Sequence, residues 1–376
     1  MPYRLPFAGQ SYPREYNPRV VSLLHRDAPQ PYTVDTPVYQ GPLDLLLQLI
    51  ERAELDITKL ALAQVTDQFL GYMRTLQELK AERVSEFIVV AARLMQIKSE
   101  ALLPRPVVRA ISAVTGDIVY LLAAPRRRVT LTNLELCFPD MDPRERRRIA
   151  RGHFHAFVRS FIDRFVFWFG SPERIRRLCS IEGYENFEAN QHRPVILLAP
   201  HFVGMDAGGV RITLESTFAS MFAVQKSKAL TEVMTKGRSR FNGARMLLRN
   251  EGMRPALRVL RDGIPFYFLP DMDLGPRDAV FVPFFGVPAA TVTSVARLAK
   301  IARAVVIPCV TRMTDDGYVV TFYPPWEDYP EPDIVAATRR VNAFIEERVL
   351  EMPEQYLFSH KRFKTRPPGE PDPYRR

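Results

Sequence analysis

The sequence predicts an α/β fold, with a mixed sheet flanked by helices and preceded by a small all-helical N-terminal unit. Two patterns support this prediction. Beyond residue 185, short apolar runs typical of strands alternate with segments of helical periodicity, as in α/β layer architectures. Before residue 105, apolar residues recur only at helical spacing. With 376 residues and 47% hydrophobic content, the chain is long enough for two domains and a sizeable core.

The chain divides by composition and periodicity into four expected parts. Residues 1–35 are rich in Pro, Tyr and Arg, lack periodicity, and are expected to be a disordered lead. Residues 36–105 carry helical patterns at 43–62 and 87–97, and Pro104 and Pro106 close this helical unit. Residues 106–368 form the main domain. The Pro- and charge-rich residues 369–376 are expected to be a flexible tail.

The main domain should begin with helices and continue as an alternation. Residues 107–185 are expected to be mostly helical and basic. Their aromatic run, from Phe165 to Phe169, fits either the core or a membrane-facing patch. A helix is expected after His201 and another near the C-terminus, at 341–349. The other expected elements are strands at 195–198, 222–224, 266–269, 305–310 and 319–323, and helices at 230–241, 255–261 and 293–301.

Charge and cysteine usage narrow the class of protein. The net charge of +10 lies entirely in residues 106–376, because residues 1–105 hold as many acidic as basic residues. This excess favours an anionic partner, which could be a phospholipid surface, a phosphorylated substrate, an acidic carrier protein or nucleic acid. Three isolated cysteines argue against a disulfide framework and fit a reducing cytoplasm. The first ten residues lack the apolar core of a secretory signal.

His201 and Asp206 are the strongest candidates for catalysis. They follow the apolar run 195–198, in an H-x4-D arrangement. A histidine held by a carboxylate suits removal of a proton from an alcohol that attacks an acyl group. Five positions along a helix turn about 140°, so the two side chains meet only if His201 ends the strand and Asp206 lies in the first helical turn. The alternative is a surface histidine near a capping aspartate.

Five motifs in residues 106–374 resemble those of the bacterial lipid A late acyltransferases, within the wider lysophospholipid acyltransferase group. His201 and Asp206 fill the H-x4-D/E motif of that family. The other four motifs occur in the family's order and are NLELCFP at 133–139, PDMDLG at 270–275, FVPFFG with AAT at 281–291, and HKRFKTRP at 360–367.

The resemblance implies transfer of a fatty acyl chain from acyl-carrier protein to a hydroxyl of a lipid A precursor. It implies a glycerolipid acyltransferase-like fold and a peripheral position at the cytoplasmic face of the bacterial inner membrane. Acyl-carrier protein thioester is the co-substrate, and no cofactor is expected. Another glycolipid or a lysophospholipid is an alternative acceptor. Only the end of the family's apolar N-terminal helix, from about Val107, can be recognised.

The same resemblance assigns roles to individual residues. His201 is the expected general base and Asp206 its orienting partner. Arg238 matches a family arginine expected to steady phosphate or the oxyanion. The remaining expected substrate contacts are Asp271, Asp273, Lys361 and Arg362. We expect backbone amides near Gly204 to complete the site as oxyanion donors.

Residues 36–104 resemble the N-terminal part of segregation and condensation protein A, the bacterial kleisins. The run YQGPLDLLL at 39–47 carries this resemblance, with support from 54–57 and 97–104. It implies an alternative function, a chromosome-segregation adaptor that binds a condensin (SMC) through residues 37–104. The linker and winged-helix part of that family are absent. The two resemblances meet just after Pro104, which indicates a gene fusion, a recombination event or a mosaic.

Metal and nucleic acid are not expected as partners. Asp271 and Asp273 are too few to specify a divalent cation, so we expect a structural or acceptor-contacting role for them. The basic stretch around Phe363 has no accompanying nucleic-acid motif. Phosphates of a lipid head group, or of the carrier protein's prosthetic arm, are the expected partners of that stretch.

Overall fold

The computed structural model describes residues 33–35, 40–42, 104–224 and 228–375. The chain separates into two compact units, Met1–Leu79 and Lys80–Arg376. In the first unit, β1 (Thr33–Asp35) pairs antiparallel with β2 (Gln40–Pro42). Most of the predicted disordered lead at 1–35 and of the helical unit at 36–105 lies outside the described residues, so that division stays a prediction. The β-branched residues Thr33 and Val34 favour extended backbone. The helices predicted within 43–103 lie outside the described residues.

The second unit is built on a seven-stranded sheet with the order β3-β11-β10-β4-β7-β5-β6. β11 runs antiparallel to β10, and every other neighbouring pair is parallel. The predicted mixed α/β sheet is therefore confirmed. The strands are β3 (Cys179–Glu182), β4 (Val195–Leu198), β5 (Ala219–Phe222), β6 (Arg245–Leu248), β7 (Phe266–Phe268), β10 (Val305–Met313) and β11 (Tyr318–Phe322).

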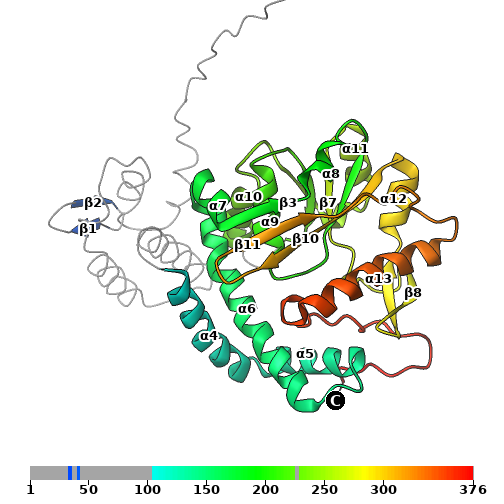
Figure 1. Cartoon of the computed structure of the whole chain (residues 1–376), viewed down its shortest axis with the longest axis horizontal. Coiled ribbons are helices and arrows are strands. Elements are labelled where there is room, and N and C mark those ends of the chain that lie inside the picture. The colour runs from blue at the N-terminus through cyan, green and yellow to red at the C-terminus, as the bar shows by residue number, and fades with distance from the viewer. Residues whose placement is uncertain (1–32, 36–39, 43–103, 225–227, 376) are drawn as a thin grey trace, which may run out of the picture. The chain divides into compact units, whose positions relative to one another are not determined.

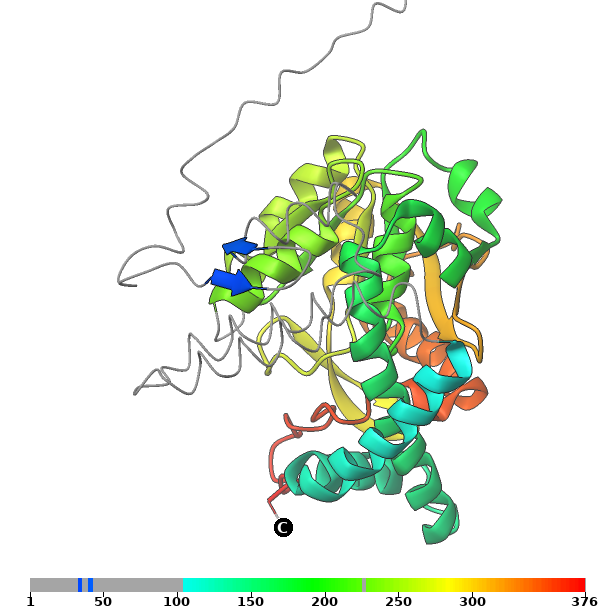
Figure 2. The same cartoon turned by 90° about the vertical axis from the view of Figure 1, so that its left-hand side faces the viewer.

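Within the described residues 104–178, four helices precede the sheet, as predicted for 107–185. They are α4 (Arg105–Leu122), α5 (Ala124–Cys137), α6 (Pro143–Phe169) and α7 (Pro172–Leu178). α6 begins where the Asp142 carboxylate accepts the amide of Arg144, with proline as the first helical residue. α4 lies along α6, as both views show (Figure 1, Figure 2). The contact is close because a Cβ on Gly116 would lie 2.8 Å from the Cα of His155.

Helices cover both faces of the sheet. Successive side chains of β4 point to opposite faces and pack against different helices. Ile196 and Leu198 pack in one hydrophobic cluster, while Val195 and Leu197 pack in another on the opposite face. The first cluster includes residues of α11 (Arg254–Arg261), α12 (Ser294–Ala302) and α13 (Ile334–Glu351). The second includes residues of α9 (Met205–Thr213), α10 (Lys228–Arg238) and the end of α6.

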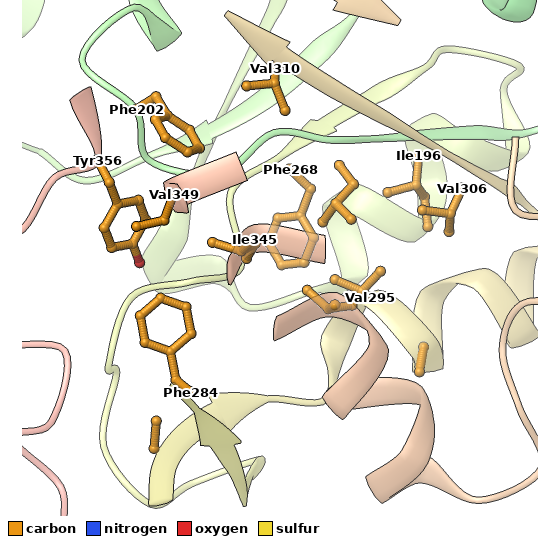
Figure 3. Packing of buried hydrophobic residues seen from close by; sticks show 14 of the residues in the cluster. Ile196, Phe202, Phe268, Phe284, Val295, Val306, Val310, Ile345, Val349 and Tyr356 are labelled. Carbon is orange, nitrogen blue, oxygen red and sulfur yellow. The ribbon is translucent and has the colours of Figure 1, made fainter. Parts of the chain in front are cut away.

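The first cluster extends from the sheet towards the C-terminal part of the chain. Figure 3 shows Ile196 and Phe268 of the sheet facing Val295 of α12 and Ile345 of α13. On the other face, Phe167 and Trp168 of the aromatic run are buried in the second cluster. Of the two interpretations of that run, these side chains fit the core.

The predicted elements of the main domain are present, with differences at their ends. The strand expected at 222–224 lies at 219–222 as β5. Several elements were not predicted from the sequence. They are β3, β6, α8 (Tyr184–Glu188), the 3-10 turns η3 (Arg249–Glu251) and η4 (Pro353–Gln355), and the antiparallel pair β8 (Ala279–Phe284) and β9 (Val287–Val292).

The C-terminal residues do not form the flexible tail that we predicted. Tyr374 is buried, with 9% of its surface exposed. Its hydroxyl accepts the amide of Phe363 at 3.0 Å and donates to the Asn133 side chain on α5. The buried ring of Tyr374 and the two hydrogen bonds of its hydroxyl hold the end of the chain against the domain. The composition of this segment does not indicate such contacts.

Candidate active site

The carboxyl ends of β4 and β7 bring His201 and Asp271 together. The two strands are parallel neighbours, with Leu198 opposite Phe268. His201 follows Leu198 by the same number of residues as Asp271 follows Phe268. Side chains at the carboxyl ends of adjacent parallel strands meet at one edge of the sheet, where ligands of open α/β sheets bind. The strand register therefore places the two residues side by side.

Asp271 binds His201 through both of its carboxylate oxygens. The Nδ1 of the imidazole lies 2.6 Å from Oδ1, and the backbone amide of His201 donates to Oδ2 at 2.9 Å. Burial raises the pKa of Asp271, but the charge and hydrogen bonds of His201, with Arg362, hold that pKa at about 2. An ionised carboxylate only accepts hydrogen bonds, so Nδ1 carries the proton of this bond and Nε2 takes no part in it.

The structure corrects the expected pairing of His201 with Asp206. Asp206 lies in the first turn of α9, as that pairing requires, yet its oxygens face two arginines. Oδ1 accepts from Nε of Arg238 at 2.7 Å, and Oδ2 lies 2.8 Å from Nε of Arg164 on α6. Burial raises the pKa of Asp206, and the two arginines reverse that shift and lower it. α9 therefore directs Asp206 to arginines of α6 and α10 instead of to His201.

A cavity of about 270 Å³ opens beside His201 and Asp271. Its other lining residues come mainly from α5, the loop after β7 and the chain after α13. Among the described residues, Asp206 and Arg238 do not belong to this lining. The lining comprises Arg126, Asn133, His201, Asp271, Met272, Asp273, Tyr356, Leu357, Phe358, His360, Lys361, Arg362 and Lys364.

Three cations line the cavity with exposed side chains, and a fourth is buried. Arg126, Lys361 and Lys364 are exposed. Arg362 was predicted to contact substrate, but its guanidinium is buried and donates to Ala290 O at 2.9 Å and to Thr291 Oγ1 at 2.8 Å. The buried acceptors therefore hold Arg362 in a structural position. Arg126, Lys361 and Lys364 are therefore the exposed cations of the cavity lining.

Asp273, the other predicted contact from the 270–275 motif, also makes internal bonds. Its carboxylate accepts the amide and the hydroxyl of Thr365, at 2.6 and 2.7 Å, and the amide of Gly275 at 3.0 Å. These bonds join the loop after β7 to the C-terminal segment. Across the described part of the chain, no cluster of three or more His, Cys, Asp or Glu side chains could hold a metal ion.

The sequence analysis did not include His360, the first residue of the 360–367 motif, or Arg126 among the assigned site residues. The ring of His360 lies 5.7 Å from that of His201, between ring centroids, in a T-shaped arrangement. Arg126 donates to Ser359 O at 3.1 Å. Both residues belong to motifs or clusters visible in the sequence, but no local pattern places the start of α5 and the end of the chain around one histidine.

The family comparison settles the class of this protein. The family model described as "Bacterial lipid A biosynthesis acyltransferase" matches residues 77–365. The chain belongs to this family. Membership makes it an acyltransferase of lipid A biosynthesis, as the motifs predicted. The match begins within residues 36–105, which we assigned to a kleisin-like unit. Most of that segment lies outside the described residues, so its kleisin resemblance and condensin partner stay predictions.

Individual relatives of this acyltransferase cover most of the chain. The lipid A biosynthesis lauroyltransferase of Escherichia coli K12 is 30% identical over 277 residues, which cover 72% of this chain and 90% of the relative. The lipid A biosynthesis myristoyltransferase of the same organism is 33% identical over 271 residues, 71% of this chain and 84% of the relative.

A solved structure also aligns with the chain. It is the 1-acyl-sn-glycerophosphate (LPA) acyltransferase PlsC from Thermotoga maritima, which covers 66% of this chain and 97% of its own. The sequence identity is 13% and the TM-score is 0.34.

Proposed function

We propose that this acyltransferase moves a fatty acyl chain from an acyl-carrier protein thioester to a hydroxyl of a lipid A precursor, with His201 as general base. The observation that carries the proposal is the Nδ1–Asp271 contact of 2.6 Å, because it holds the ring through Nδ1 and keeps Nε2 out of that bond, in the lining of a cavity. A base whose unperturbed pKa is near neutrality suits this transfer and typically contributes about 10²–10⁴-fold to the rate.

The step conserves atoms and charge. The acceptor oxygen attacks the thioester carbonyl while its proton passes to Nε2 of His201, and the carbonyl oxygen becomes an oxyanion. The C–S bond then breaks, and the proton on Nε2 passes to the departing sulfur. Asp271 stabilises the intermediate imidazolium and holds the ring in position. Asp206 has a different part in this proposal, since it orders Arg238 and Arg164 behind the site.

The exposed cations suit the phosphates of the acceptor. Arg126, Lys361 and Lys364 surround the cavity mouth. Lys361 extends over the ring of Tyr374, with Nζ 5.3 Å from the centroid. Cations grouped at a cavity attract anions and raise their local concentration. The same three cations would also attract an acidic carrier protein.

α4 suits peripheral attachment to a membrane surface. Among the described residues, no single helix is long and apolar enough to cross a membrane, although α4 and α5 together pass that test and are bent by 93°. One face of α4 packs on α6 and the other is apolar and exposed, with Val114 at 63% and Leu121 at 66%. The full stripe is Val107, Ile111, Val114, Ile118 and Leu121. We place the protein at the cytoplasmic face of the inner membrane, where the carrier protein is available.

The transfer itself is tested with purified protein. Acyl-carrier protein thioester and lipid A precursor are the substrates, and the lipid products are identified by mass. His201→Ala should lower turnover by at least 100-fold in a protein that still folds, as circular dichroism would check. Wild-type turnover in His201→Ala would refute the assignment of the base.

Membrane attachment is tested by flotation with anionic phospholipid vesicles. Ile111→Asp with Ile118→Asp should abolish co-flotation, because both changes charge the exposed stripe. Leu350→Asp is the matched control, since Leu350 is 63% exposed on α13. Equal binding by the stripe variant and the control would exclude α4 as the attachment surface.

A further inference from the structure

His360 is a second histidine in the lining of the cavity beside His201. Its ring and that of His201 line the same cavity, with centroids 5.7 Å apart and planes at 64°. His201 uses Nδ1 for Asp271. No described residue hydrogen-bonds to the ring nitrogens of His360. A polar ring beside the base, with no internal partner, is available to a substrate in the cavity.

The backbone around His360 is held by buried polar groups from two helices. Asn133 of α5 donates to Phe358 O at 2.7 Å and to His360 O at 2.6 Å. On α6, Nε2 of His153 lies 3.2 Å from the hydroxyl of Ser359. The amide of Leu357 donates to the carbonyl of His201 itself, at 2.9 Å. The two histidines are therefore fixed relative to each other, as a preorganised site requires.

Several backbone amides next to His201 already have acceptors. The amide of His201 donates to Asp271, and that of Phe202 donates to Pro200 O. The amides of Val203 and Met205 donate to Gln355 O and Phe202 O. The amides around Gly204 at the start of α9 stay predicted oxyanion donors. A developing oxyanion beside His201 can take a further donor from a side chain, and the ring of His360 lies 5.7 Å from that of His201.

The protonation state of His360 suits this role. Burial lowers its pKa to about 4, and repulsion by His201 adds to the effect. The ring is therefore neutral near pH 7 and carries one N–H. A neutral imidazole can polarise a carbonyl without a proton leaving it.

We propose that His360 is a second catalytic residue, whose N–H donates to the thioester carbonyl oxygen as negative charge develops there, while His201 takes the hydroxyl proton. This inference rests on the proposed transfer reaction. No proton leaves His360 during the step. Asn133 is a positioning residue, since it holds the carbonyl of His360.

The test compares two replacements of similar size that differ in their N–H groups. His360→Leu lacks a donor, and His360→Gln keeps one. We expect kcat to fall about 10²–10³-fold in His360→Leu, the typical effect of removing one oxyanion donor, with an unchanged KM for the lipid acceptor. His360→Gln should remain within about 10-fold of the wild type. The exposed His192 supplies the matched control, His192→Gln, which should transfer at the wild-type rate.

The other outcomes overturn the inference. Equal kcat values in the Leu and Gln variants would mean that the N–H has no catalytic effect. A raised KM for the lipid with unchanged kcat would assign His360 to phosphate binding instead. Absence of transfer in the wild type and in His192→Gln would refute the proposed reaction itself, a result distinct from loss in His360→Leu alone.

Discussion

Asp271 fixes His201 by its ring and by its backbone together, at 2.6 and 2.9 Å. Two bonds from one carboxylate to one residue restrict both the rotation of the imidazole and the path of the loop after β4. Fixed orientation matters for a general base because proton transfer needs a well-aligned hydrogen bond. The relationship makes Asp271, rather than Asp206, the residue whose loss should most directly affect the base.

Asp271→Asn should lower kcat for acyl transfer by at least 100-fold. The amide is nearly the same size but carries no charge to stabilise the imidazolium. Steady-state kinetics with acyl-carrier protein thioester measure the effect. Asp278→Asn is the control, since Asp278 is exposed and pairs with Arg297 at the surface. Wild-type kcat in Asp271→Asn would contradict the proposed role.

Asp206→Asn should destabilise the fold by about 3 kcal/mol. The substitution leaves Arg164 and Arg238 facing a neutral group in a largely buried position, and breaking a buried ion pair typically costs about 3–5 kcal/mol. Urea unfolding measures the loss. An unchanged unfolding midpoint would show that the two arginines find other partners.

Tyr374→Phe should destabilise the protein by about 1–3 kcal/mol. The change removes the donor to the buried Oδ1 of Asn133 and the acceptor of the Phe363 amide. Tyr329→Phe is the control, because the buried hydroxyl of Tyr329 has no partner among the described residues and its removal should cost nothing. Equal stability of the two variants would restore the flexible tail predicted from the sequence.

Stability should fall as the pH is lowered from about 6.5 to 4, in part because of His153. Burial lowers the pKa of His153 to about 4 in the folded state. An unfolded histidine takes up its proton near pH 6.5, so the unfolded state binds more protons within this window. Each such group contributes at most about 1.4 kcal/mol per pH unit. Unfolding experiments between pH 7 and 4.5 should show a smaller slope for His153→Gln than for the wild type. Equal slopes would show that His153 titrates normally.

The apolar runs of the sequence were sufficient to predict the sheet and to place His201 just beyond the strand 195–198. The run 195–198 formed β4, and His201 lies just beyond it because a strand buried on both faces must end where polar residues begin. The alternation of strands and helices predicted the mixed sheet for the same reason. Local hydrophobic burial decides these features, and it is visible in the order of residues.

The partner of His201 was decided only by the tertiary structure. Asp206 is close in sequence, yet Asp271 lies closer in space because β4 and β7 are neighbours in the sheet. The role of Asp206, the buried position of Arg362 and the place of His360 beside the base likewise depend on contacts between distant segments. Local spacing limits which side chains can meet, whereas strand order and helix packing select the pairs that do.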